Sequence, residues 1–395
     1  MTPRFSLVYP TRHRPAFLAR ALAFVEQQTF ADFEVIVSDN WVDPTLSCAE
    51  ICRASSIPNL IYVHPPEPVG MVANWNLAAQ HATGDYVCIF TDKMLLLPDA
   101  LARADRALRA WASGGNEPDI LSWVSDSFQP ARYPDYFGQG VYTATQADAI
   151  TWAPAQSYNP RQALAEKCEA DVSRYEQSAT QYCQGKMVFG AYSKSLIARI
   201  TERFGQLFHD ISPDYTSMIL ALSMATSAIE LRASAVVSIN TDLSNGMLGA
   251  IHDQHALGYL RSLSPDVRQM LNDLLVPGMF ASQANIVSHD YLSLKRRFQL
   301  PLELNVRHWL GYCIEDLSRP DRVWSSAQVE AQQTVLMHEF VGALAPLDQQ
   351  AVIHRLESRI ETRNRGVIPN SIPGQRQSWS TESLDDAVRR RCAWS

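Results

Sequence analysis

The N-terminal part of the chain contains a strand–helix–strand pattern that restricts how the chain can fold. Phe5-Ser-Leu-Val-Tyr9 is an apolar run typical of a strand, and a second run, Glu34-Val-Ile-Val-Ser38, ends at Asp39-Asn40. Between them, Pro15 fits the first turn of a helix, and the apolar residues that follow recur at helical spacing. The crossover is long enough to join parallel strands. The pattern therefore predicts a βαβ unit with polar residues at the carboxyl ends of its strands, where open α/β sheets bind ligands.

Two common phosphate-binding motifs are missing from the sequence. No G-x-G-x-x-G follows the first strand, and G-x-x-x-x-G-K-[ST] does not occur. A nucleotide at this sheet edge would therefore be held by side chains and strand ends. A nucleotidyltransferase is disfavoured, because it would normally place a glycine-rich turn where this chain has Pro10-Thr-Arg-His-Arg-Pro15.

The alternation of strands and helices continues beyond the first unit and predicts a mostly parallel sheet covered on both faces. Helical patterns dominate from about residue 253, and loop-type composition returns near residue 366. We therefore expect an α/β domain over residues 1–250, a helical region over 251–365 and an extended tail over 366–395.

Composition excludes several classes of protein. The formal net charge is -7, and no long run of Lys or Arg occurs, which argues against a dedicated nucleic-acid binder. Seven cysteines without a C-x-x-C pair do not form a disulfide framework and favour a reducing cytoplasm. No uncharged run approaches the length of a transmembrane span.

Three blocks of sequence resemble the family 2 glycosyltransferases, which are inverting enzymes with a GT-A fold that use nucleotide-diphosphate sugars. The first block runs from P-T-R-H-R-P through the helix to Q-Q-T-F-A-D-F-E-V-I-V-S-D-N. The second contains Gly70-Met-Val-Ala-Asn-Trp-Asn76 and the strand that ends at Thr91-Asp92-Lys93, and the third is Pro213-Asp214-Tyr215. The resemblance covers roughly residues 4–246 and implies a GT-A-like (Rossmann-like) α/β fold there. The helical C-terminal region is expected from its residue pattern alone, because the last third of the chain carries no family signal.

The resemblance also implies a set of nucleotide-binding residues. Among them, Asp39 would accept hydrogen bonds from a base or ribose, although a strand-end aspartate is also a common helix cap or turn residue. The nucleotide-binding candidates are Pro10, Thr11, Arg14, Asp39, Asn40 and Asn76.

The predicted metal or diphosphate site departs from the family pattern. The family's D-x-D motif supplies two aspartates to a Mn²⁺ or Mg²⁺ ion, but this chain has Asp92 followed by Lys93. The ammonium of Lys93 could screen a departing diphosphate in place of a cation, or it could form an ordinary salt bridge. The degenerate motif leaves the requirement for a divalent cation open.

Asp214 is the candidate catalytic base, because inverting sugar transfer needs one group that takes the proton of the acceptor hydroxyl. An aspartate at a helix start is also an ordinary cap, and Asp210 is the alternative base. Asn245 and Gly246, in a predicted turn after the last strand, are candidates for the acceptor or sugar side; a turn without a ligand is the alternative.

These features predict a hexosyltransferase-type enzyme of polysaccharide biosynthesis that transfers a sugar to a hydroxyl of a glycan or lipid-linked acceptor with inversion. The alternative is a catalytically silent GT-A-like domain that binds a nucleotide sugar or glycan as a scaffold. We expect a cytoplasmic location, either free or peripheral to the inner face of the membrane. The C-terminal helices are expected to cap the site, bind a partner or form a homo-oligomer interface.

Overall fold

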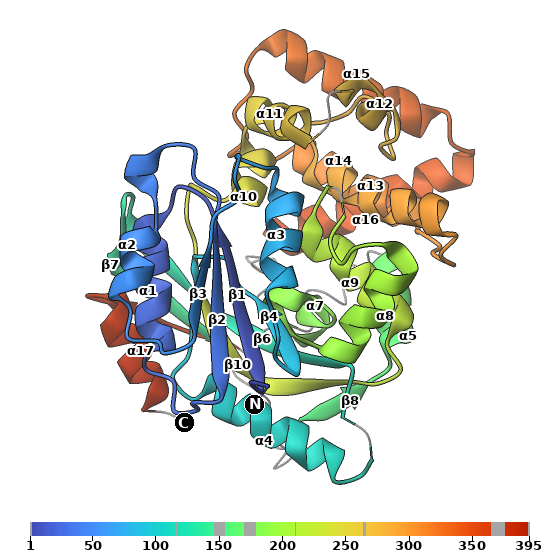
Figure 1. Ribbon diagram of the computed structural model, residues 1–395. Helices are drawn as coiled ribbons and strands as arrows, with labels where there is room; N and C mark the ends of the chain where they lie inside the picture. Colours follow the sequence, from blue (N-terminus) through green and yellow to red (C-terminus); the bar gives the residue numbers. More distant parts are fainter. Residues whose placement is uncertain are drawn as a thin grey trace.

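The computed structural model describes residues 2–115, 117–145, 155–169, 179–209, 211–263, 266–364 and 376–393. Eleven strands within these residues form one sheet, with the main order β11-β7-β6-β9-β4-β1-β2-β3 (Figure 1). Of the three remaining strands, β10 pairs with β6, and β5 and β8 pair with β10. The strands are β1 (Phe5–Thr11), β2 (Phe33–Asp39), β3 (Leu60–Val63), β4 (Tyr86–Ile89), β5 (Met94–Leu96), β6 (Ile120–Arg132), β7 (Asp135–Thr145), β8 (Gln156–Tyr158), β9 (Gly190–Ser193), β10 (Ala228–Ile239) and β11 (Arg376–Thr381).

The N-terminal half of the sheet is parallel. Strand β1 pairs with β2 on one side and β4 on the other, and β2 pairs with β3. All seven residues of β1 are buried, as expected for a parallel strand covered on both faces. The other half is mixed, because β6 is antiparallel to β7 and β9 but parallel to β10. This architecture confirms the predicted α/β fold.

Helices cover both faces of the parallel strands. In Figure 1, α1 and α2 lie to the left of β1 and β2, and α3 lies to their right.

Local sequence defines the helix ends: the Ser193 side chain accepts a hydrogen bond from the Leu196 amide at the start of α8, and Gly205, with φ of 86°, follows its end. The helices are α1 (Pro15–Val25), α2 (Ala49–Ala54), α3 (Met71–Gln80), α4 (Ala100–Ala112), α5 (Pro160–Glu169), α7 (Ala179–Cys183), α8 (Lys194–Phe204) and α9 (Pro213–Met224), with 3-10 turns η1 (Pro44–Leu46) and η2 (Met187–Phe189).

The helical C-terminal region is confirmed and forms a lobe beside α3 and α9 (Figure 1). It has apolar clusters of its own, one around Leu260 and Ile286 and another around Leu310 and Met337. Helix α13 packs directly against α9 of the α/β part. The helices are α10 (Asn245–Ile251), α11 (Asp253–Leu263), α12 (Val267–Asn272), α13 (Gln283–Phe298), α14 (Val306–Leu317), α15 (Ala327–Gly342) and α16 (Pro346–Asn364).

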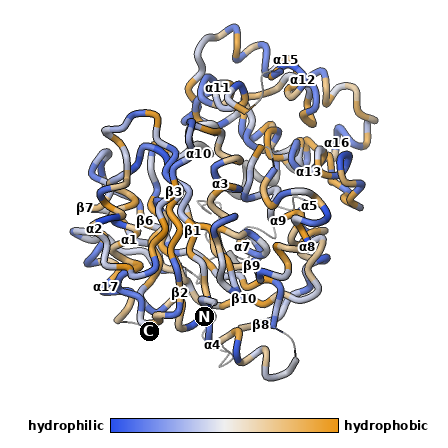
Figure 2. The backbone as a smooth tube through the Cα atoms, viewed as in Figure 1, coloured by the Kyte–Doolittle hydropathy of each residue, from blue (hydrophilic) through white to orange (hydrophobic). Residues whose placement is uncertain are grey.

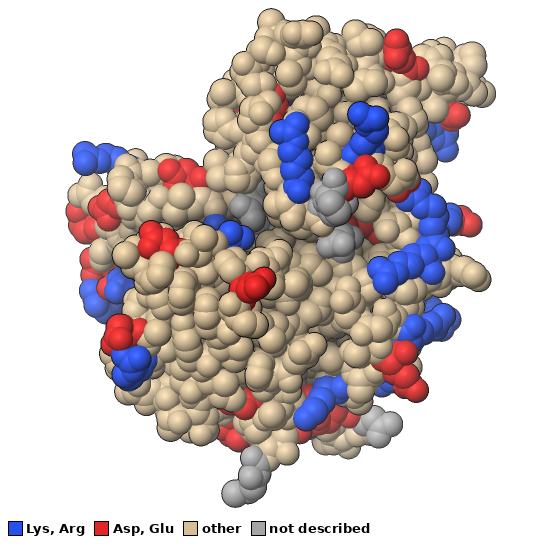
Figure 3. Space-filling model, turned by 45° about the horizontal axis from the view of Figure 1, so that its top comes forward, with Lys and Arg blue, Asp and Glu red and all other residues tan. Residues whose placement is uncertain are grey.

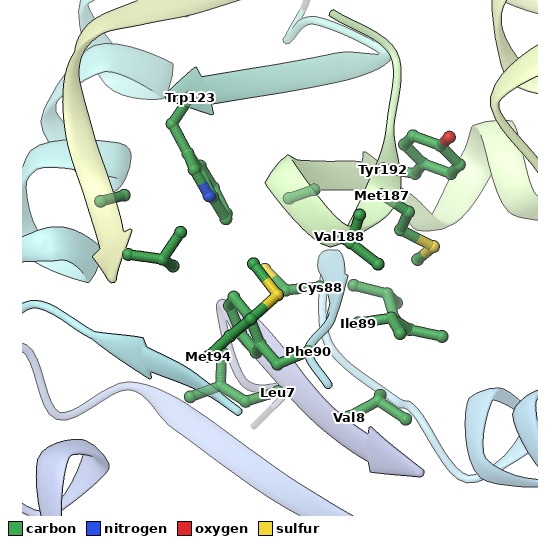
Figure 4. Packing of buried hydrophobic residues seen from close by; sticks show 14 of the residues in the cluster. Leu7, Val8, Cys88, Ile89, Phe90, Met94, Trp123, Met187, Val188 and Tyr192 are labelled. Carbon is green, nitrogen blue, oxygen red and sulfur yellow. The ribbon is translucent and has the colours of Figure 1, made fainter. Parts of the chain in front are cut away.

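The main hydrophobic core lies along the central strands, where the backbone is most hydrophobic (Figure 2). Phe90, which follows β4, packs between Tyr9 and Trp123, with ring centroids 5.4 and 6.3 Å away. Leu7, Cys88 and Met94 lie around the same ring (Figure 4). This packing fixes β1, β4 and β6 relative to one another, and so fixes the residues that follow them.

The structure corrects the expected extended tail. Residues 376–381 form β11, which pairs antiparallel with β7, and Leu384–Cys392 form α17. The Arg391 guanidinium donates from Nε to the fully buried carboxylate of Asp126 at 2.9 Å. Sequence reasoning missed this segment because its pairing partners lie more than 200 residues away. The rest of the predicted tail, residues 366–375 and 394–395, lies outside the described residues.

We expect Arg391→Met to lower the free energy of unfolding by about 2 kcal/mol, because it leaves the buried Asp126 carboxylate without its cationic donor. Urea unfolding would measure the change. Arg389→Met on the same helix is the matched control: Arg389 forms an exposed pair with Asp386, and surface pairs contribute about 0–1 kcal/mol. Equal stabilities of the two variants would contradict a structural role for Arg391.

Charged side chains of both signs are interspersed on the face shown in Figure 3. No helix in the described part of the chain is both long enough and apolar enough to cross a membrane.

Candidate active site

Polar side chains from three neighbouring strands meet at the carboxyl edge of the parallel half-sheet. Thr11 ends β1 and lies in register with Asp39, which ends β2. Asp92 follows β4, and its Oδ2 accepts a hydrogen bond from Thr11 Oγ1 at 2.8 Å. Thr11, Asp39 and Asp92 are all buried, as is Pro10 within β1. The parallel register therefore brings together the strand-end residues that the sequence indicated.

Asp39 has one oxygen bound by the protein and one without a partner. Its Oδ2 accepts hydrogen bonds from the Cys48 amide at 2.6 Å and from the Tyr62 hydroxyl at 3.0 Å. Its Oδ1 is buried and has no hydrogen-bond partner among the described residues. A buried carboxylate oxygen without a donor is costly, so this atom is suited to receive an N–H or O–H group of a ligand.

A stacked ring pair lies beside Asp39. The indole of Trp41 and the imidazole of His64 are parallel within 6°, with centroids 4.2 Å apart. His64 Nδ1 also lies 2.7 Å from the backbone oxygen of Asp39. Trp41 Nε1 is a second buried polar atom without a partner in the described part of the chain. The carboxyl end of β2 thus offers a ligand a hydrogen-bond acceptor, Asp39 Oδ1, a hydrogen-bond donor, Trp41 Nε1, and an aromatic surface.

Arg14 and Lys93 connect the strand ends to the start of α10. Arg14 Nη1 pairs with Asp92 Oδ1 at 3.2 Å, and its Nη2 donates to the backbone oxygen of Leu243. Lys93 Nζ donates to Ser244 Oγ at 3.1 Å. Burial, and then the charge of Arg14, lowers the pKa of Lys93. Two cationic side chains, Arg14 and Lys93, therefore lie near the carboxylate of Asp92.

Asn245 and Gly246, the acceptor-side candidates, are the first residues of α10 and directly follow Ser244. Apart from its chain neighbours and the nearby backbone of its own helix, no described atom lies within 4 Å of where a Cβ on Gly246 would be, so this position is open. The two residues thus lie next to the segment that Arg14 and Lys93 contact.

Asp214 lies in the first turn of α9 and is partly buried. Burial raises the pKa of Asp214, whereas the charges of Lys186 and Lys93 act in the opposite direction. A carboxylate with a raised pKa is a stronger proton acceptor than an ordinary aspartate. Asp210, the alternative base, lies outside the described residues.

Lys186 is a neighbour of Asp214 that sequence reasoning missed. Its ammonium is buried, and Nζ lies 3.7 Å from the ring centroid of Tyr182 and 4.1 Å from that of Tyr215. Burial opposes the charge, but Tyr182, Tyr215 and Asp214 outweigh burial and raise the pKa of Lys186. The only local signal was a lone lysine between Gly185 and an apolar run.

The side chains of two candidate nucleotide-binding residues, Asn40 and Asn76, form hydrogen bonds to the protein backbone. Asn40 donates to the backbone oxygen of Val69 at 2.8 Å and accepts from its amide at 3.0 Å. Asn76 donates to the backbone oxygen of Phe208 at 2.9 Å and accepts from the same residue's amide at 3.2 Å. A nucleotide contact by either side chain would have to compete with these bonds.

Comparison with known proteins identifies the N-terminal part of the chain. The family described as glycosyl transferase family 2 matches over residues 6–112, which include β1, β2, β4 and the Asp92 segment. Residues 6–112 belong to glycosyl transferase family 2.

One curated relative of this glycosyltransferase segment is a GalNAc(5)-diNAcBac-PP-undecaprenol beta-1,3-glucosyltransferase from Campylobacter jejuni, 30% identical over 101 residues. The match covers 25% of this chain and 33% of the relative, so the chain spans about a third of that protein's length. Among solved structures, S. aureus TarS 1-349 in complex with UDP-GlcNAc is 15% identical, with a TM-score of 0.44 and 92% of each chain covered. The Pyrobaculum calidifontis mannosyltransferase PcManGT in complex with GDP-Man and Mn²⁺ is 16% identical, with a TM-score of 0.41, covering 91% of this chain and 88% of that one.

The residues of this glycosyltransferase segment do not fit the divalent cation that the family motif implies. Asp92 is the one aspartate of that motif, and Arg14 and Thr11 already bind its two oxygens. Within the described ranges, no group of three His, Cys, Asp or Glu side chains is placed to hold a metal ion. A cation would also have to compete with the neighbouring charges of Arg14 and Lys93.

Proposed function

We propose that this chain is an inverting glycosyltransferase that moves a sugar from a nucleotide-diphosphate sugar to an acceptor hydroxyl. The observation that supports the proposal most is the convergence of Thr11, Asp39 and Asp92 at the carboxyl ends of parallel strands within a family 2 glycosyltransferase segment. Lys93 follows Asp92 directly, and the charges of Lys186 and Lys93 act on the carboxylate of Asp214. A base and a diphosphate-stabilising cation are the two groups that such a transfer needs.

In the proposed reaction, the acceptor oxygen attacks the anomeric carbon from the face opposite the nucleotide. A new carbon–oxygen bond forms to the acceptor, and the bond to the diphosphate breaks. Asp214 takes the proton of the acceptor hydroxyl, and the bond electrons leave with the nucleoside diphosphate. Lys93 and Arg14 would stabilise the added negative charge of that diphosphate.

We propose that the nucleotide base binds at the edge of β2. The unpartnered Oδ1 of Asp39 would accept an N–H group of the base or an O–H group of the ribose, and Thr11 and Pro10 would line the site from β1. The acceptor would enter from the side of Asn245 and Gly246. For the acceptor we propose a glycan or lipid-linked glycan; the name of the Campylobacter relative specifies an undecaprenol-linked glycan. Such an acceptor would bring the enzyme to the inner face of the membrane.

A panel of UDP, GDP, UDP-GlcNAc, UDP-glucose and GDP-mannose tests this function by thermal shift, with and without Mn²⁺. A ligand present at a hundred times its dissociation constant stabilises the native state by about 2.7 kcal/mol. Release of nucleoside diphosphate is then measured for every sugar nucleotide that binds. Binding without release, even with candidate acceptors present, would favour the catalytically silent scaffold instead.

We expect Asp39→Asn to weaken nucleotide binding by about 1.5–3 kcal/mol, because it removes a charged hydrogen-bond acceptor. Isothermal calorimetry with the nucleotide selected by the panel would measure this. Glu26→Gln is the matched control, since Glu26 accepts hydrogen bonds from Ser55 and Ser56 away from the strand ends. If Asp39→Asn is folded and binds as tightly as this control, the base is not held by Asp39.

A further inference from the structure

The segment that leads into Asp214 is held by the helical C-terminal region. Asp290, on α13, is fully buried, and its carboxylate accepts hydrogen bonds from the backbone amides of Ile211 and Ser212. The Ser212 amide lies 3.2 Å from Asp290 Oδ2. Ser212 is the N-cap residue of α9, so these hydrogen bonds hold the backbone two positions before Asp214.

A second helix of this region holds the same segment. The hydroxyl of Tyr259, on α11, donates to the backbone oxygen of Ile211 at 2.7 Å. The Ile211 side chain is fully buried in the apolar cluster that contains Leu260 and Ile286. Ile211 is therefore anchored through its amide, its carbonyl and its side chain by residues from beyond position 250.

The α/β part holds the other end of the segment. Asn76 binds both backbone polar groups of Phe208, as described above, and the Thr216 hydroxyl accepts from the His209 amide at 3.1 Å. The approach to Asp214 is thus fixed between α3 on one side and α11 and α13 on the other. Figure 1 shows the helical lobe against this side of α9.

We propose that the helical C-terminal region completes the active site, and that Asp290 is the positioning residue that holds Asp214 at the start of α9. This inference rests on the proposed function, in which Asp214 is the base. It gives a function to the helical C-terminal region, which lies outside the family match over residues 6–112.

The chemistry of Asp290 fits this task. A carboxylate has two acceptor oxygens and can bind two adjacent backbone amides, whereas the side chain of asparagine has one. Burial, and the nearby charge of Asp214, disfavour the ionised form and raise the pKa of Asp290, while the Ile211 and Ser212 amides act in the opposite direction. The charged groups around Asp214 are Asp290 from α13, Lys186 from the turn before η2, and Lys93 from the turn between β4 and β5.

The test is Asp290→Asn in the full chain, with UDP-GlcNAc, UDP-glucose and GDP-mannose as donor probes and nucleoside diphosphate release as the readout. Because a misplacement of about 1 Å can cost roughly a hundredfold, we expect kcat to fall by at least about tenfold while the donor KM changes less than about twofold. Hydrogen exchange should become faster at the amides of Ile211 and Ser212. Tyr259→Phe, a milder change, should lower kcat in the same direction.

Asp316→Asn is the matched control. Asp316 on α14 also accepts hydrogen bonds at the start of a helix, from Ser282 Oγ and the Ala284 amide, each at 2.8 Å, but these lie within the C-terminal region. We expect this variant to keep the wild-type kcat and the wild-type exchange at residues 211 and 212.

The outcomes separate this inference from the proposed function. If Asp214→Asn abolishes turnover but Asp290→Asn and Tyr259→Phe both keep wild-type kcat, Asp290 does not position the base, and the inference is wrong. An equal loss of kcat in Asp290→Asn and Asp316→Asn would also overturn it, because the effect would then be general to the helical region. Wild-type turnover in Asp214→Asn would instead refute the base assignment.

Discussion

Replacing Asp214 with asparagine is expected to lower turnover by at least about a hundredfold and to leave donor binding nearly unchanged. The substitution keeps the shape of the side chain but removes the proton acceptor, and general base catalysis contributes typically 10²–10⁴-fold. Single-turnover release of nucleoside diphosphate gives the rate, and calorimetry with the same sugar nucleotide gives the affinity.

The pH dependence provides an internal control for this prediction. Asp214 must be ionised to act as a base, and burial raises its pKa, so activity should be lost on acidification at a higher pH than an ordinary aspartate would give. Lys186 favours the ionised form, so Lys186→Met should move this loss of activity to still higher pH. A shift to lower pH in Lys186→Met, or wild-type turnover in Asp214→Asn, would show that another group is the base.

Replacing Lys93 with alanine is expected to lower turnover by roughly a hundredfold, and the wild-type enzyme is expected to resist EDTA. Both results follow if the Lys93 ammonium, with Arg14, stabilises the departing diphosphate, since removing one such donor costs about 10²–10³-fold. Turnover assays with EDTA, Mg²⁺ or Mn²⁺ would measure both effects. Added Mn²⁺ should restore activity to Lys93→Ala only if the vacated space beside Asp92 admits an ion.

Lys194→Ala is the matched control for Lys93, because Lys194 Nζ binds the Thr83 carbonyl at 3.0 Å on the exposed surface. It should leave turnover unchanged. Activity that disappears in EDTA and returns with Mn²⁺, combined with a nearly silent Lys93→Ala, would contradict the assignment of Lys93. Asp92 would then have to bind an ion with water and donor phosphates completing its shell.

The sequence predicted the parallel half of the fold because its information there is local. Each of these strands is a short apolar run, Pro15 lies at a helix start, and the crossover is long enough for parallel pairing. The convergence of Thr11, Asp39 and Asp92 follows from that pairing, because parallel strands end at the same edge. These residues could therefore be predicted to lie together without a structure.

The remaining parts of the site depend on contacts between residues far apart in sequence. Asp290 reaches Ile211 across 79 positions, and Arg391 reaches Asp126 across 265. No periodicity or motif in the sequence predicts these long-range contacts. Loop-type composition near residue 366 predicted a tail, but β11 forms because β7 offers an edge to pair with, which the segment itself does not show.

The Asn76 hypothesis illustrates a further limit. The family resemblance implies a nucleotide contact for Asn76, and in the structure both polar atoms of its amide bind the backbone of Phe208. A polar side chain on a helix gives no indication of whether a backbone segment or a ligand will satisfy it. Only the tertiary arrangement shows that this amide supports the approach to Asp214.

The most direct test of the account is time-resolved proton NMR of the sugar released from, or transferred from, an α-linked donor such as UDP-GlcNAc, UDP-glucose or GDP-mannose. We predict that the β-anomer or β-linked product forms first, with EDTA present, and that the same reaction with Asp214→Asn forms product at least about a hundredfold more slowly. An α-configured first product, or equal rates for the two proteins, would contradict single-step inversion with Asp214 as the base.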